Sequence, residues 1–396
     1  MSEMTPTAPR QQRSYAAQVV REVFMQWGAR IGIAWIAVLV VVAVFAPFLA
    51  NSHPLLLSEQ GHLSSPLLHN LTAADATLLL LFFIVLALCF IGSISFRRKF
   101  LITMVTGAIV ASGCFAFIAP PQLTIYEQYR EKELAGDYQW LIRAPIPYSA
   151  KDYLRDVGDS GLKAPLAAEQ RSHWFGTDEN GADVLSRMIH ASRIALSIGF
   201  VATGIAMVIG TLIGGLMGYF SGIYDMIGMR LVEIFEAIPV LFLLLTFVAF
   251  FGSNLYVMMI IIGITGWTGY ARFVRAEFLR LRQQEFVQAA IACGLPLRSI
   301  LFRHMLPNGM APILVSTSFG VASAILAEAT LSFLGLGLVD DPSWGQMLNQ
   351  AVQAATFNWW MAVFPGGAIF LTVFAYNLIG ETMRDAIDPY LKKSAK

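Results

Sequence analysis

Long apolar windows alternate with short polar segments along most of the chain. A helix that crosses a hydrocarbon core of about 30 Å needs about 20 mainly apolar residues, because each residue rises about 1.5 Å. The windows that satisfy this requirement are 31–50, 73–94, 100–119, 194–219, 233–251, 255–273, 311–333 and 360–379. The first is too long for the apolar region of a signal peptide, so we expect it to remain as an anchor. The pattern predicts an all-α polytopic membrane protein with about eight transmembrane helices.

Composition supports this assignment and excludes other classes of protein. Of the 396 residues, 56% are hydrophobic and 13% are charged, and the mean hydropathy is +0.62. An ordinary soluble domain has about 25% charged residues. Disordered chains are more polar, collagen-like chains have a periodic glycine, and disulfide-rich chains have many cysteines, so this composition excludes all three classes. The net charge of +1 provides no field that would attract nucleic acid, so we expect no nucleic-acid partner.

The distribution of basic residues predicts the orientation in the membrane. If the N-terminus is cytoplasmic, 18 of the 27 Lys and Arg lie in cytoplasmic segments. The short exterior loops 51–72, 252–254 and 334–359 then contain no Lys or Arg. Short cytoplasmic loops carry the basic excess in membrane proteins, so both termini are expected in the cytoplasm.

The predicted spans divide the chain into four regions. Residues 1–119 hold three spans, and residues 120–190 form a long extracytoplasmic loop in which acids outnumber bases. Residues 191–385 hold five spans and a long cytoplasmic loop at 272–307, and residues 386–396 form a cytoplasmic tail.

The three cysteines offer no metal or disulfide chemistry. Cys89, Cys114 and Cys293 are too few and too widely spaced for a disulfide framework or a zinc site. We expect all three to be small buried hydrophobic residues.

The end of the exterior loop permits two interpretations. Asp178, Asn180 and Asp183 could supply oxygen ligands to calcium, but their spacing departs from the EF-hand pattern and no glutamate occupies its twelfth position. Alternatively, Asn180-Gly181 forms a turn and Asp183 caps a short amphipathic helix that leads into the membrane. The second interpretation is favoured, and no metal site is predicted.

The cytoplasmic loop contains a short predicted helix outside the membrane. Residues 285–293 favour a helix, Gly294 can adopt the left-handed conformation that ends it, and Pro296 prevents its continuation. The small residues Ala289, Ala290 and Ala292 would let another protein approach closely. A basic amphipathic helix on anionic lipid, attracted by the arginines at 275, 280 and 282, is an equal alternative on physical grounds.

This loop resembles the EAA loop of ABC importer permeases. Gln288-Ala289-Ala290, three residues, Gly294 and a later Leu306-Pro307 match the pattern, with Gln288 in place of Glu and His304 in place of Ile. Both substitutions are similar to those of the dipeptide/oligopeptide/nickel family. Other segments of the chain resemble the C-type subunit of this family. They are His173 with 175–178, 183–187, Gly218-Tyr219 with Asp225, 328–337 with 343–345, and 384–389.

The resemblance covers roughly residues 171–390 and implies a type I ABC importer permease core. Members of this branch have six spans, so 73–94 and 100–119 look like an inserted pair. The apolar runs 78–81 and 105–108 lack ionisable residues, and we expect this pair at the periphery of the bundle.

The resemblance also implies a function and a set of partners. The chain would be the permease subunit of an ATP-driven importer for peptides or similar small solutes, in a bacterial inner membrane. Its partners would be a second homologous permease in a heterodimer, two ABC ATPase subunits and an extracytoplasmic solute-binding protein. The chain has no phosphate-binding loop motif, so it is not predicted to be an enzyme, and ATP and Mg would bind the ATPase subunits. The implied coupling residues are Glu285, Gln288, Ala289, Ala290, Gly294, Leu306 and Pro307.

Ionisable and aromatic residues near the span ends supply further candidates. Glu328 and Ser332 share a helix face and could line the translocation path or play a structural role. Glu233 and Glu236 are expected to reach interfacial water or pair with Arg230. The tryptophans at 344, 359 and 360 are expected in an interfacial belt.

Two other classes of function compete with the importer. A secondary transporter would require discontinuous helices and a mid-membrane acidic site, whereas the acids here lie near span ends. A non-transporting receptor or anchor would act through the exterior loop. Co-purification with an ATPase chain would distinguish the importer from both.

Overall fold

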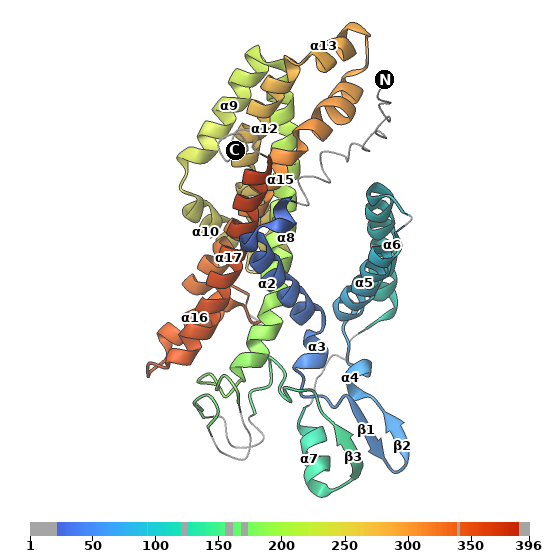
Figure 1. The fold of residues 1–396 in the computed structure, drawn as a ribbon. Helices are drawn as coiled ribbons and strands as arrows, with labels where there is room; N and C mark the ends of the chain where they lie inside the picture. Colours follow the sequence, from blue (N-terminus) through green and yellow to red (C-terminus); the bar gives the residue numbers. More distant parts are fainter. Residues whose placement is uncertain are drawn as a thin grey trace, which may run out of the picture.

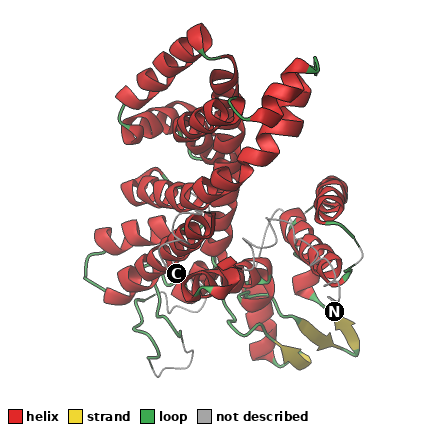
Figure 2. Cartoon of the chain, turned by 45° about the horizontal axis from the view of Figure 1, so that its top comes forward, coloured by secondary structure: helices red, strands yellow, loops and turns green. Residues whose placement is uncertain are grey.

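The computed structural model describes residues 22–92, 94–119, 126–154, 161–167, 173–338 and 341–387. The predicted tail beyond residue 387 and the first 21 residues lie outside this set. The described part is mainly helical (Figures 1 and 2). In chain order its elements are α2 (Trp27–Val44), α3 (Ala46–Leu49), β1 (Leu56–Glu59), β2 (His62–Ser64), α4 (Pro66–His69), α5 (Ala73–Phe90), α6 (Phe96–Phe117), α7 (Glu127–Ala135), β3 (Tyr138–Ile142), α8 (Val184–Phe220), α9 (Gly222–Ala237), α10 (Val240–Phe251), α11 (Leu255–Thr265), α12 (Trp267–Arg282), α13 (Glu285–Ala292), α14 (Leu297–Ser299), the π-helix η2 (Ile300–Met305), α15 (Leu306–Leu331), the π-helix η3 (Ser332–Leu336), α16 (Trp344–Gln353) and α17 (Trp359–Ile387).

Seven of the eight predicted windows fall on helices of membrane-spanning length, and the window 233–251 falls on a bent pair of helices. Among the described residues, seven helical segments are long and apolar enough to cross a membrane, and α9 with α10 makes an eighth if this bent pair is one span. The pair bends by 80°. Pro239 explains the break, because the residue before a proline is forced out of the helical region and Ile238 has ψ 122°. The predicted polytopic fold is therefore confirmed.

The helix α8 is the central element of the bundle. It packs along α2, α11, α12 and α15, and Figure 1 shows it crossing most of the molecule. Its 37 residues extend about 55 Å, which exceeds the thickness of a hydrocarbon core. Asp183 caps this helix and the helix leads into the membrane, as predicted, but the capped segment is the first part of α8 and not a short helix.

Glycines spaced by four residues allow α8 to approach α12 closely. A Cβ on Gly210 would lie 2.4 Å from the Cβ of Tyr270, and one on Gly218 would lie 2.6 Å from the Cβ of Phe278. Lipid tails are as apolar as the helix surfaces, so no hydrophobic force drives helices together in a membrane. Helices associate there mainly through close packing of this kind. The spacing of Gly210, Gly214 and Gly218 is a signal in the sequence from which this close approach could be predicted.

A three-stranded antiparallel sheet lies at the end of the molecule opposite α13 (Figure 1), with the order β2-β1-β3. Leu57 pairs with Ser64 on one side and with Leu141 on the other. We call residues 51–72 and 126–154 the sheet domain. These strands were not predicted from the sequence. The domain is also not built from one continuous segment, because its residues come from both sides of α5 and α6.

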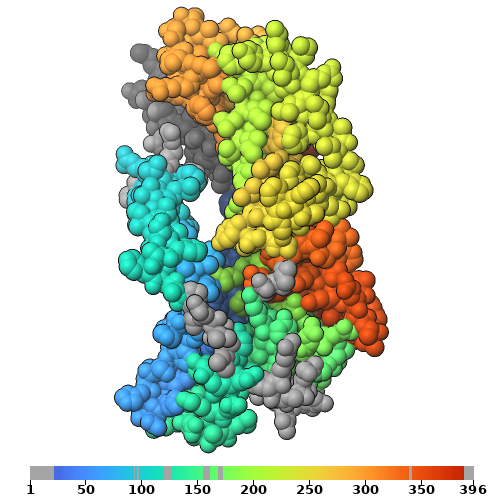
Figure 3. All heavy atoms as spheres, turned by 180° about the vertical axis from the view of Figure 1, so that it is seen from behind, coloured from blue at the N-terminus to red at the C-terminus, as the bar shows by residue number. Residues whose placement is uncertain are grey.

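The helices α5 and α6 form a hairpin beside the bundle. A capping box begins α5, in which Thr72 and Asp75 exchange side-chain and backbone hydrogen bonds. Within their apolar windows, 17% of α5 and 11% of the α6 segment are buried. Figure 3 shows an open gap between the hairpin and the bundle. The expected peripheral position is confirmed.

Burial of the cysteines differs from the prediction. Cys114 is buried in the hairpin, as expected, whereas Cys89 and Cys293 are exposed. Cys89 lies on an outward face of α5, and Cys293 is the C-cap of α13. The prediction of three buried cysteines was wrong for these two.

Candidate functional site

The predicted extramembrane helix is present as α13, and it ends at Gly294 through a complete Schellman motif. The Leu295 N–H donates to the Ala290 carbonyl at 3.2 Å, and the Gly294 N–H donates to the Ile291 carbonyl at 2.9 Å. Gly294 has φ +69°, the left-handed conformation expected of it. This termination turns the chain back toward α14 and η2.

One face of α13 is held against the rest of the loop. Val287 is fully buried and Ala290 is 6% exposed, and both belong to a cluster with Ile300, Leu301 and Met305. Ala290 therefore does not lie on the free face, and the expectation that it is displayed was wrong. The helix register decides this, because Val287 and Ala290 are three residues apart and share a side.

The opposite face of α13 is exposed. It carries Glu285, Gln288, Ala289 and Ala292, and Figure 1 places α13 at the far end of the molecule from the sheet. The Gln288 side chain donates to the Arg282 carbonyl at 2.7 Å, which fixes it near the end of α12. The free surface is thus a small, nearly uncharged patch on a short helix.

Leu306 and Pro307 lie at the other end of the loop. They form the start of α15, which continues from η2 without a break, since the Leu306 N–H donates to the Leu301 carbonyl. Leu306 is partly buried against the cluster that holds α13, and Pro307 is exposed. The structure therefore connects α13 through η2 to a spanning helix.

The arginines of the loop do not form a lipid-binding face on α13. Arg275 makes a two-point ion pair with Asp225 of α9, and Arg280 pairs with Glu277. Arg282 donates to the Ser221 hydroxyl at 2.7 Å and lies over the Tyr219 ring. These residues belong to α12, whereas Glu285 is the only charged residue of α13. This arrangement disfavours the basic amphipathic helix.

The two glutamates before Pro239 both form ion pairs. Glu233 pairs with Arg230, as predicted, but Glu236 pairs with Arg272 of α12. All four side chains are at least one-third exposed, so each pair contributes at most about 1 kcal/mol to stability.

Glu328 and Ser332 come together in the interior of the chain. The Ser332 hydroxyl donates to Glu328 Oε1 at 2.6 Å, and Ser343, the N-cap of α16, also hydrogen-bonds this carboxyl group. Glu328 is 2% exposed and Ser332 is 1% exposed. In this arrangement the pair joins α15 to α16 and has almost no surface available to a solute.

Backbone and side-chain donors occupy the carboxylates of the exterior motif. Asp178 accepts from the N–H groups of Asn180 and Ala182, both at 2.9 Å, and from Arg187. Asp183 accepts from the Ser186 N–H at 2.7 Å, as an N-cap should, and contacts His173 Nδ1 at 2.8 Å. Among the described residues, no group of three metal-ligating side chains could hold an ion.

Two of the three tryptophans assigned to an interfacial belt are buried. Trp344 donates to the Met188 carbonyl at 3.2 Å, and Trp360 donates to the Thr177 carbonyl at 3.0 Å. They are 2% and 7% exposed, whereas Trp359 is 48% exposed. The belt assignment was wrong for Trp344 and Trp360, which join α16 and α17 to α8 and its preceding loop.

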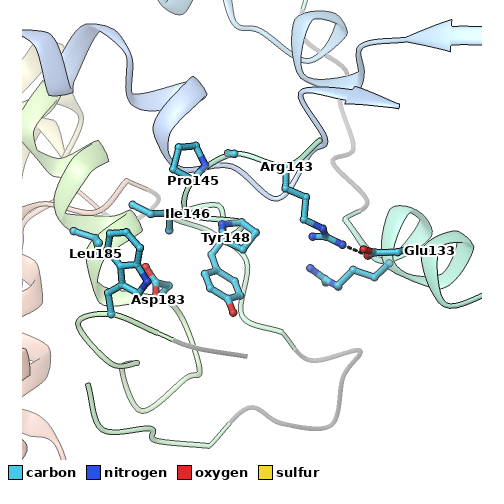
Figure 4. Close-up of a pocket in the computed structure, with 11 residues that line it drawn as sticks. Glu133, Arg143, Pro145, Ile146, Tyr148, Asp183 and Leu185 are labelled. Carbon is cyan, nitrogen blue, oxygen red and sulfur yellow. Dashed lines mark hydrogen bonds and ion pairs between the residues drawn. The ribbon is translucent and has the colours of Figure 1, made fainter. Parts of the chain in front are cut away.

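A cavity of about 430 Å³ adjoins the exterior motif (Figure 4). Its walls combine the Arg143–Glu133 ion pair at one side with Pro145, Tyr148 and Asp183 at the other. Tyr148 stacks on the buried His173 ring, with centroids 4.3 Å apart. Sequence patterns did not indicate this cavity, because its two walls come from segments that are distant along the chain.

Comparison with known proteins agrees with this architecture. The family described as "Binding-protein-dependent transport system inner membrane component" matches residues 210–393. The oligopeptide transport system permease protein OppC of Haemophilus influenzae is 41% identical over 218 residues, which are 55% of this chain and 70% of that protein. The dipeptide transport system permease protein DppC of Alkalihalophilus pseudofirmus is 38% identical over 252 residues, 63% of this chain and 81% of that protein.

A third relative and one solved structure extend the comparison. The glutathione transport system permease protein GsiD of Pectobacterium atrosepticum is 39% identical over 62% of this chain and 80% of its own length. An inward-facing structure of the MetNI methionine ABC transporter matches with 19% identity and a TM-score of 0.40, over 52% of this chain and 98% of that chain. The chain is 41% identical to OppC over 70% of that protein, and the family match extends from α8 to α17. The chain therefore belongs to the family of inner-membrane components of binding-protein-dependent transport systems.

Proposed function

We propose that this chain is the peptide-importing permease subunit of an ABC transporter, and that α13 is its coupling helix to an ATPase subunit. The relatives that support the peptide assignment are named for transport of oligopeptides, dipeptides and glutathione. The chain would form half of the translocation path, with a second homologous permease forming the other half.

The observation that carries the coupling role is the two-sided environment of α13. Val287 and Ala290 fix one face to η2, while Gln288 and Ala289 are exposed on the other. A helix fixed in this way moves with α12 and α15 as a rigid unit. Closure of an ATPase pair around its free face would therefore rock the spanning helices.

The distribution of Lys and Arg supports an orientation with α13 and both termini in the cytoplasm. The sheet domain and the Asp178–Asp183 motif would then face the extracytoplasmic side, where a solute-binding protein delivers peptide. ATP and Mg would bind the two ATPase subunits. No residue of this chain would perform covalent chemistry.

The test is Ala289→Trp in the complex reconstituted with its partner permease and ATPases. A bulky ring on the free face should prevent docking and reduce both ATPase retention and peptide-stimulated hydrolysis about tenfold or more. Ala290→Trp does not serve this purpose, because its ring would disrupt the internal cluster of the loop.

Ala108→Trp is the matched control. It adds the same bulk at an exposed position of α6 and should leave ATPase retention unchanged. Wild-type retention and hydrolysis in Ala289→Trp would show that α13 does not dock on an ATPase.

A further inference from the structure

A cavity of about 480 Å³ lies where the α5–α6 hairpin meets the bundle. Its lining includes Asp75 and Leu78 from the first turns of α5, and Arg193, Ile194 and Ser197 from α8. The cavity therefore extends along two facing helices from their polar ends toward the apolar part of each.

The Asp75 carboxylate in this cavity is already satisfied. Its Oδ1 accepts from Arg193 Nη1 at 2.5 Å, and its Oδ2 accepts from the Thr72 N–H at 2.9 Å and the Thr72 hydroxyl at 2.7 Å. This arrangement both caps α5 and holds the hairpin to α8.

The Arg193 guanidinium, by contrast, has donor capacity left over. Its Nη2 is buried and has no hydrogen-bond partner among the described residues. The Arg193 side chain is 17% exposed and lines the cavity, so an acceptor bound there can reach the part of the guanidinium that faces the cavity. Guanidinium groups form charge-assisted hydrogen bonds with phosphate and carboxylate oxygens, whose geometry they match.

The charges around the cavity balance. Lys151 pairs with Asp341 at 2.9 Å, and both line the cavity together with Arg193 and Asp75. Because Asp75 is satisfied, the groups left to a ligand are Arg193 and the half-exposed pair of Lys151 and Asp341. Cations beside an accessible carboxylate suit a headgroup that carries both a phosphate and an ammonium group better than they suit a free anion. The apolar lining from Leu78, Ile194 and Leu255 suits the glycerol and upper acyl region of a lipid.

The gap between hairpin and bundle explains how such a molecule would be held (Figure 3). Large apolar side chains of the hairpin are exposed, with Leu80 at 48% and Phe83 at 53%. At the depth of the hydrocarbon core, acyl chains rather than water fill a gap of this kind. We propose that the cavity binds the headgroup of a zwitterionic phospholipid whose acyl chains occupy the gap between the α5–α6 hairpin and the bundle.

The experiment compares lipid retention in the purified transporter complex from nanodiscs of equimolar phosphatidylethanolamine and phosphatidylglycerol. Native mass spectrometry should detect one retained phosphatidylethanolamine per copy of this chain. Arg193→Gln removes the phosphate-binding group and should lower retention about tenfold or more. Asp75→Asn removes the ion pair but leaves the cation, so retention should equal or exceed that of the wild type.

Two further variants separate lipid binding from folding. Ser197→Trp fills the cavity without changing the Asp75–Arg193 pair and should also expel the lipid. Ser112→Trp makes the same change at an exposed position of α6 outside the cavity and should leave retention unchanged. Each complex is compared only when its size-exclusion profile matches the wild type.

Three results would overturn the proposal. Retention in Arg193→Gln and Ser197→Trp equal to the wild type would show that the cavity holds no lipid. Displacement of the lipid by inorganic phosphate would identify a site for free anions. Displacement by a soluble dipeptide would identify a solute site. The inference requires only that the chain spans a membrane, so it is independent of the docking role of α13.

Discussion

Gly214 of α8 lies directly against the backbone of Ala271 in α12, and a Cβ at this position would be 2.3 Å from the Ala271 carbonyl oxygen. No side chain fits without separation of the two helices. Val232 and Trp267 pack beside this crossing, so the contact also positions α9. The crossing connects the central helix to the helix that leads into α13.

We therefore expect Gly214→Val to destabilise the protein by about 3 kcal/mol, the upper part of the usual range for overpacking. Gly204→Val in the same helix is the control, because nothing lies within 4 Å of a Cβ there. Survival of the monodisperse peak after heating, measured by size-exclusion chromatography, should fall for Gly214→Val alone. Equal survival of the two variants would contradict the close approach.

Local signals explain why much of the fold could be predicted. A spanning helix needs only a long apolar window, and the stop at Gly294 needs only a glycine that can adopt positive φ. Both features are encoded in a few consecutive residues. They do not depend on the positions of other segments.

Features that depend on distant segments were missed. Strand β1 pairs with β3 across a membrane hairpin, so no local pattern joins Leu57 to Leu141. The burial of Ala290 depends on η2, and the burial of Trp344 depends on the Met188 carbonyl of α8. Alanine and tryptophan are common in both buried and exposed positions, so their identities alone could not decide between the alternatives.

The left-handed conformation of Gly294 leads to a graded prediction. A Cβ at this position meets open space, so the cost of substitution comes from the backbone alone, about 1–2 kcal/mol for an ordinary residue. We expect peptide-stimulated ATPase activity to decrease in the order Gly294→Asn, Gly294→Ala, Gly294→Val, because asparagine tolerates positive φ and a β-branched residue resists it. An order unrelated to this conformational cost would argue against the Schellman motif as the element that sets the angle of α13.

The sheet domain depends on a buried ion pair between Arg130 and Asp152. Their nitrogen and oxygen atoms are 2.6 Å apart, and the side chains are 6% and 4% exposed. Removal of one partner leaves a buried charge without compensation, so Arg130→Met should destabilise this domain by about 3–5 kcal/mol. Limited proteolysis should cut the variant faster within residues 126–154.

The exposed pair of Arg143 and Glu133 provides the comparison. Its side chains are 28% and 41% exposed, and an exposed pair contributes at most about 1 kcal/mol. Arg143→Met should therefore be cut at nearly the wild-type rate. Similar cleavage rates for Arg130→Met and Arg143→Met would show that the buried Arg130–Asp152 pair does not stabilise the domain more than an exposed pair does.

His53 predicts how the stability of the sheet domain depends on pH. Burial lowers the pKa of His53 to about 4, against the opposing effect of the Asp152 charge. Its Nδ1 lies 3.0 Å from the Asn51 side-chain oxygen, and its ring contacts the edges of Tyr126 and Tyr129. The folded protein therefore keeps this imidazole neutral, whereas the unfolded chain protonates it near its ordinary pKa of 6.5.

The sign of the effect follows from proton binding. Between pH 6.5 and about 4 the unfolded state binds more protons at this position than the folded state, so the His53 contribution is complete above pH 6.5 and decreases as the pH falls to about 4. His53→Phe keeps a ring against Tyr126 and Tyr129 but cannot be protonated. The rate of proteolysis within the sheet domain, measured from pH 7.5 to 4.5 with an acid-tolerant protease, should rise more steeply in the wild type than in His53→Phe. Parallel pH profiles for the two proteins would mean that other groups, such as Asp152, account for the acid sensitivity of the domain.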